Sequence, residues 1–178
     1  MSGDQGIDLR VTPEGIEAFC REIVAGSANT GRKHATLVAL EGFIARHAGA
    51  DSHSPAYEEI LRRIRNFSER TRSELLAEQA QALDAALERG DAIAAGHIHR
   101  SLSRNGFAQV VALLRQRIEP SRRRRIEAGV RAWCEQAEQA ARAASGWPDA
   151  MNFRAAGIDL EAYRAMKDIL AQLTEERP

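Results

Sequence analysis

Apolar residues recur along this chain at intervals of three and four positions, the spacing that places them on one side of an α-helix. The first stripe follows the helix start signal Thr12-Pro13 and ends before Gly26; its members are Ile16, Phe19, Cys20, Ile23 and Val24. A similar stripe predicts a second helix over residues 31–47. No stretch alternates apolar and polar residues with a period of two, so the pattern predicts an all-α fold.

Residues 55–89 form the longest stretch without an internal proline or glycine, and Gly90 follows it. As one helix this stretch would extend about 50 Å, at about 1.5 Å per residue. Its apolar stripe thins between Ser68 and Ser73, so two shorter helices are the alternative.

Helix signals continue in the second half of the chain. Asp91 is a suitable N-cap for a helix over residues 92–104, and we expect Asn105-Gly106 to end that helix. Pro120 then separates residues 107–119 from a helix that begins near Arg122, because proline cannot continue a helix from within. One kinked helix over residues 107–144 is the alternative.

The helix after Pro120 carries a seam of apolar residues whose side chains are large at its start and small at its end: Ile126, Val130, Trp133, Ala137, Ala140 and Ala144. A last helix is expected over residues 160–174. Short connections between such helices favour an antiparallel helical bundle of about seven helices, with one long helix near residues 55–89. We expect a single all-α domain over residues 1–178, with residues 147–178 as a C-terminal helical appendage in the alternative.

The charge of the chain is balanced overall but not along its length, with 25 basic and 25 acidic residues. Residues 1–60 carry nine acids and five bases (−4), residues 61–131 eight and fifteen (+7), and residues 132–178 eight and five (−3). A nucleic-acid-binding domain is typically basic as a whole. A basic centre between acidic ends instead favours a protein that neutralises its own charge.

Four consecutive arginines, Arg122–Arg125, stand where a helix should begin. The start of a helix is electropositive, so each badly placed cation there costs about 0.3–1 kcal/mol unless an anion offsets it. Acidic side chains of the same chain, full solvation or an anionic ligand could offset these cations. The candidate anion- or partner-binding residues are Arg100, Arg104, Arg115, Arg117, Arg122, Arg123, Arg124 and Arg125. His97 and Trp147 are candidates for a groove or interface.

Residues that could carry catalysis are scattered in the sequence. Cys20 and Cys134 lie on or beside apolar stripes, so we expect buried free thiols and no nucleophile. The histidines lack the spacing of metal ligands; His97 and His99 diverge by about 200° on a helix. We therefore expect neither a metal nor a cofactor. The chain has no signal pattern and no apolar run of about 20 residues, so a cytoplasmic location without membrane insertion is expected.

These patterns favour a non-catalytic helical interaction or regulatory module that binds a partner protein or itself through helix faces. The first alternative is a nucleic-acid- or polyanion-binding protein that uses the basic region 97–131. The more remote alternative is an enzyme whose site is assembled only in three dimensions.

Overall fold

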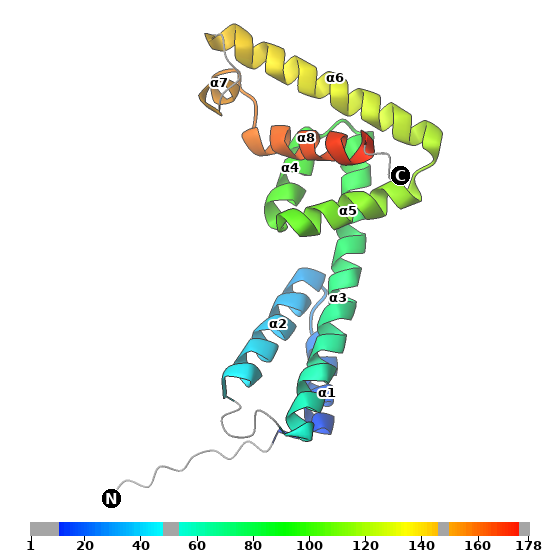
Figure 1. Cartoon of the computed structure of the whole chain (residues 1–178), viewed down its shortest axis with the longest axis vertical. Helices are drawn as coiled ribbons and strands as arrows, with labels where there is room; N and C mark the ends of the chain where they lie inside the picture. The colour runs from blue at the N-terminus through cyan, green and yellow to red at the C-terminus, as the bar shows by residue number, and fades with distance from the viewer. Residues whose placement is uncertain (1–10, 48–53, 146–149, 175–178) are drawn as a thin grey trace, which may run out of the picture. The chain divides into compact units, whose positions relative to one another are not determined.

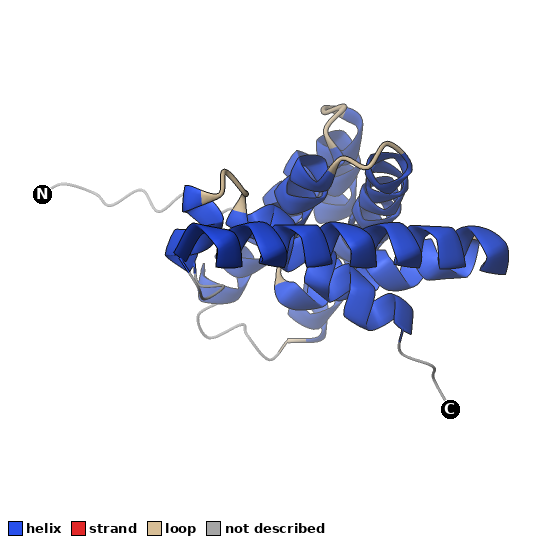
Figure 2. Cartoon of the chain, turned by 90° about the horizontal axis from the view of Figure 1, so that it is seen from above, coloured by secondary structure: helices blue, strands red, loops and turns tan. Residues whose placement is uncertain are grey.

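The computed structural model describes residues 11–47, 54–145 and 150–174, and within these ranges it is made of helices and loops without a strand (Figures 1 and 2). The eight helices are α1 (Pro13–Ala25), α2 (Thr30–His47), α3 (Pro55–Glu88), α4 (Ala92–Ser101), α5 (Arg104–Arg117), α6 (Pro120–Ser145), α7 (Ala150–Ala155) and α8 (Leu160–Thr174). The predicted all-α bundle and its long helix are confirmed. None of the described helices has the combination of length and apolar character that crossing a membrane requires.

The long helix α3 is continuous, so the alternative of a break between Ser68 and Ser73 is wrong. Thr71 and Ser73 satisfy their hydroxyl groups within the helix, and Ser68 contacts His34 of α2. The buried Thr71 hydroxyl donates to the carbonyl oxygens of Phe67 and Ser68, at 2.9 and 3.0 Å. A thin apolar stripe therefore does not end this helix, because its threonine bonds back to the preceding turn.

Contacts divide the chain into two compact units, Met1–Leu75 and Leu76–Pro178, and α3 contributes to both. The first unit is built from α1, α2 and the first part of α3. The Thr12 hydroxyl caps α1 by accepting from the backbone N–H of Gly15. The small core consists of Ile16 and Cys20 from α1, Leu37 from α2, and Ile60 and Ile64 from α3. The expected single domain over residues 1–178, with or without an appendage at 147–178, remains a prediction.

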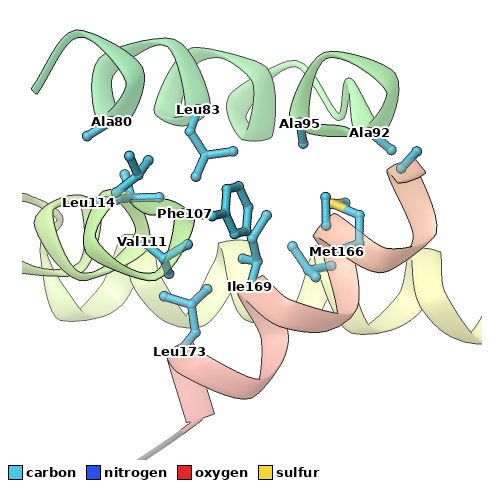
Figure 3. Close-up of a cluster of buried hydrophobic side chains, with 14 of the residues drawn as sticks. Ala80, Leu83, Ala92, Ala95, Phe107, Val111, Leu114, Met166, Ile169 and Leu173 are labelled. Atoms are coloured by element: carbon cyan, nitrogen blue, oxygen red, sulfur yellow. The ribbon is translucent and has the colours of Figure 1, made fainter. Parts of the chain in front are cut away.

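The second unit, residues 76–178, has the larger core. Phe107 of α5 lies at its centre, among Leu83 of α3 and Met166 and Ile169 of α8 (Figure 3). Helix α8 packs against α4, α5 and α6, so it belongs to the centre of this unit (Figure 1). Its apolar face, Ala162, Ala165, Met166, Ile169 and Leu173, is buried along the helix.

The junction between α4 and α5 differs from the expectation. Helix α4 ends at Ser101, and Asn105-Gly106 lies inside the first turn of α5. The cause is the Ser103 hydroxyl, which accepts from the backbone N–H of Gly106 and begins a new helix. The expected helix over residues 92–104 is thus wrong at its end, and Arg104 shares no helix with His97.

Helix α6 begins at Pro120, while α5 ends at Arg117, so residues 107–144 form two helices and not one kinked helix. The four arginines therefore do lie in the first turns of a helix. The apolar seam of α6 is shifted from its expected position, because Cys134 and Ala141 are buried whereas Ala140 and Ala144 are exposed. The seam shifts because the C-terminal half of α6 packs against Phe153 of α7 and the first residues of α8.

Helices α4 and α8 approach each other closely at Gly96. A Cβ atom added at Gly96 would lie 2.7 Å from the backbone nitrogen of Ala162 and 2.9 Å from its Cα. One turn later, His99 lies between two carboxylates of α8. Its Nδ1 is 3.2 Å from Glu161 and its Nε2 is 3.1 Å from Asp168. A side chain at position 96 would therefore force the two helices apart at their closest point.

Candidate functional site

Two of the four arginines at the start of α6, Arg122 and Arg123, have partners within the chain. Arg122 donates to Asp84 of α3 at 2.7 Å and lies 3.6 Å from Glu88. The Arg122–Asp84 pair is partly buried, with 30% and 29% of the two side chains exposed. The first guanidinium at the electropositive end of α6 is thus offset by acids from the same unit.

The next arginine meets a different partner, the carboxyl end of α8. Arg123 donates to the carbonyl oxygen of Leu173 at 2.7 Å, and Arg115 donates to that of Gln172 at 3.2 Å. The last four carbonyls of a helix lack partners within it and form its electronegative end. Arg123 is poorly placed with respect to the dipole of α6 but well placed with respect to that of α8. The unfavourable position of Arg122 and Arg123 at the start of α6 is therefore offset by groups of the same chain.

The remaining candidate residues are exposed. Arg100 lies 3.8 Å from Asp159, a weak surface pair. Within the described ranges, four candidates make no hydrogen bond or ion pair: Arg104, Arg117, Arg124 and Arg125. His97 is exposed on α4, and Trp147 lies outside the described residues. The structure does not gather these eight arginines into one site, since three of them serve internal contacts.

A cavity of 330 Å³ opens beside the arginine run, within residues 76–178. Three elements line it. Helix α3 and the turn after it supply Leu87, Glu88 and Gly90, helix α6 supplies Arg122, Arg125, Ile126, Gly129, Val130 and Trp133, and α8 supplies Met166. Gly90 makes this turn at a positive φ of 68°, and the next backbone N–H, of Asp91, donates to Ala86 at 2.8 Å. This Schellman-type end stops α3 at the edge of the cavity.

The lining of this cavity, which we call the α6 pocket, changes character along α6. Its members on α6 are spaced at three and four residues and so share one side of the helix. The basic residues Arg122 and Arg125 come first, and Trp133 comes last. Gly129 stands between them, and a Cβ atom there would meet nothing within 4 Å. The pocket therefore has a cationic end, at which Arg122 and Arg125 outnumber Glu88, and an apolar end, with open space at Gly129 between them.

Arg122, Arg125 and the apolar members of the α6 stripe are recognisable from the sequence, but the pocket is not. Leu87, Glu88 and Met166 come from other helices, and no signal in the sequence places them opposite α6. The role of Gly129 had a weak signal, because a glycine inside a long helix lowers its stability and calls for a reason.

His99 is a second group that the sequence analysis set aside. Its side chain is 17% exposed, and its ring meets that of Phe107 edge-on at 4.6 Å between centroids. Its two nitrogens face different carboxylates in different directions, so Glu161 and Asp168 cannot share a metal ion with it. In the part of the chain that the structure describes, no three His, Cys, Asp or Glu side chains converge as metal ligands. His99 therefore joins α4 to α8.

The two thiols are buried and free, as expected. Burial raises the pKa of both Cys20 and Cys134 above the ordinary thiol value, so neither is a thiolate at neutral pH.

Tyr163 donates to Glu138 at 2.6 Å, and this bond lowers the pKa of the Glu138 carboxyl. Burial and the same carboxylate raise the pKa of Tyr163. The bond between Tyr163 of α8 and Glu138 of α6 thus holds these two helices together.

The comparisons with known proteins add no relative: no family model, no curated protein and no solved structure matches this chain.

Proposed function

We propose that this protein is a non-catalytic helical interaction module, and that its first unit associates with a second copy of the chain through exposed apolar helix faces. The observation that carries the proposal is the exposure of Phe19, Val38 and Phe43, whose residues are 48%, 48% and 50% accessible. Five large apolar side chains are exposed in the described residues, and only Ile93 lies outside the first unit.

The charged residues of the same unit are largely occupied with one another. Arg63 donates to Glu59 and to Glu17, each at 2.7 Å, and Arg65 donates to Glu41 at 2.6 Å. The unit thus satisfies most of its charges while leaving Phe19, Val38 and Phe43 in water, and burying these side chains against another protein would remove their apolar surface from water. The formal net charge of zero favours a second copy as the partner, because two such chains do not repel each other.

A polyanion-binding function is the second candidate, favoured by Arg104, Arg117, Arg124 and Arg125, which have no partner among the residues that the structure describes. Against it, Arg115, Arg122 and Arg123 are engaged in the fold. Heparin retention at low salt that falls steeply as salt rises would support this function in place of self-association. Failure of the protein to bind heparin at low salt would exclude polyanion binding.

Sedimentation velocity of the full chain over a range of concentrations tests the proposal. We expect a dimer or higher species that the triple variant Phe19→Ser, Val38→Ser, Phe43→Ser converts to monomer. The matched control is Ile93→Ser, which removes the exposed apolar side chain of the second unit and should leave the association unchanged. A wild-type chain that stays monomeric, or a control that dissociates as the triple variant does, would reject self-association through this unit.

A further inference from the structure

We infer that the α6 pocket is a binding site for a small amphipathic anion, of which a medium-chain carboxylate is the simplest member. The inference concerns residues 76–178 alone and does not depend on association through the first unit.

The size of the pocket suits a small ligand. A cavity of 330 Å³ has room for a molecule such as octanoate, with eight carbons and two oxygens. The volume lies at the lower end of ordinary small-molecule pockets.

The walls define the body of the ligand. Leu87, Ile126 and Val130 are apolar, as are Trp133 and Met166, and they come from three different helices. Water gains no hydrogen bonds from such walls, so an alkyl or aromatic body is stabilised there by leaving water. Met166 adapts to irregular apolar shapes because its thioether chain is flexible and polarisable.

The cationic end defines the head group. Arg122 is already bonded to Asp84 and lies near Glu88, so its charge is met within the chain. Arg125 also lines the pocket and has no such partner among the described residues. Arg125 precedes Gly129 by about one helical turn, and a Cβ atom at Gly129 would meet nothing within 4 Å. An anionic head on Arg125 with an apolar body toward Trp133 matches this order of residues along α6.

The anion also answers the electrostatic conflict at the start of α6. Intramolecular partners compensate Arg122 and Arg123, but Arg125 is left as a surplus cation in the early turns of the helix. A carboxylate bound there would be stabilised by the guanidinium through a charge-assisted contact, the strong class of hydrogen bond.

Fluorescence of Trp133 provides the test, in full-length Trp147→Phe protein so that Trp133 is the only tryptophan. The probes are sodium octanoate, octanol and octylammonium chloride, titrated separately. We expect a saturable change with octanoate, weaker binding of octanol, and the weakest binding of octylammonium. No saturable change with octanoate, or octanol binding as tightly as octanoate, would overturn the inference.

Two pairs of variants locate the bound anion. Gly129→Leu places a large side chain where a Cβ atom meets nothing within 4 Å and should weaken octanoate binding at least tenfold. Ala128→Leu places the same side chain at the neighbouring exposed position and should not weaken it. Arg125→Gln should weaken it about tenfold, the loss expected for one charge-assisted contact, whereas Arg124→Gln should leave it unchanged. Equal effects within either pair would place the ligand elsewhere and reject the site. Far-UV circular dichroism shows that each variant is folded before it is titrated.

Discussion

The close approach of α4 and α8 makes Gly96 the position where the smallest possible change should have a large effect. Replacing Gly96 with alanine adds one methyl group. Its carbon would lie 2.7 Å from the nitrogen of Ala162, 2.9 Å from its Cα and 3.0 Å from the carbonyl carbon of Glu161. Carbon atoms in proteins pack at about 3.5–4.0 Å, so the helices must separate by roughly 1 Å. The obstacle is helix backbone, which cannot move aside as a flexible side chain would.

The magnitude follows from two opposed effects. Overpacking a tight site typically costs about 1–3 kcal/mol. Alanine in place of glycine inside a helix returns up to about 1 kcal/mol. Gly129 is the matched control, because it also lies inside a helix of the same unit but a Cβ there meets nothing within 4 Å. We expect Gly129→Ala to stabilise the unit by about 0.5–1 kcal/mol and Gly96→Ala to lie about 1–3 kcal/mol below it.

Urea unfolding followed by tryptophan fluorescence measures this difference, since both tryptophans, Trp133 and Trp147, belong to the second unit. The expected difference in the free energy of unfolding between the two variants corresponds to a difference of about 4 °C or more in Tm for a domain of this size. A Gly96→Ala protein as stable as Gly129→Ala would refute the reasoning, because it would show that α4 and α8 do not approach as closely as described.

Three further predictions concern the contacts that hold the second unit together. Arg123→Gln should lower the free energy of unfolding by about 1 kcal/mol, because it removes a partner of the α8 carboxyl end, whereas Arg124→Gln should change it by less than about 0.5 kcal/mol; equal urea midpoints would contradict this. His99→Gln should cost about 1–3 kcal/mol, because it removes the imidazole contacts from α4 to Glu161 and Asp168 of α8, while the exposed His97→Gln should be neutral. A neutral His99→Gln would show that these contacts contribute nothing. The bond from Tyr163 lowers the folded-state pKa of Glu138, so its contribution is present above the unfolded pKa and is lost as pH falls through the folded value. Stability should therefore decrease below about pH 4.5, and Tyr163→Phe should reduce that decrease; an unchanged pH profile of the urea midpoint in Tyr163→Phe would refute the assignment.

The local signals that the chain carries within a few residues predicted its helices well. Thr12-Pro13 begins α1 and Gly90 ends α3, because capping and helix termination depend on neighbouring backbone groups only. The prediction that Asn105-Gly106 ends a helix was wrong, and the cause is again local. Ser103 accepts a hydrogen bond from the backbone N–H of Gly106 and so begins the next helix at Arg104, ahead of these two residues.

The conflict at Arg122–Arg125 was visible in the sequence, because a helix start disfavours cations whatever surrounds it. Its resolution was not, since Asp84, Gln172 and Leu173 are brought to the arginines by the packing of α3 and α8. The same holds for the α6 pocket, whose walls come from three helices, and for Gly96, whose role depends on a helix more than 60 residues away. Sequence alone determined which residues form helices and where charge is in excess, because both follow from local chemistry. Which partners meet that charge, and where space is left open, depend on packing, because packing joins segments that are far apart in the chain.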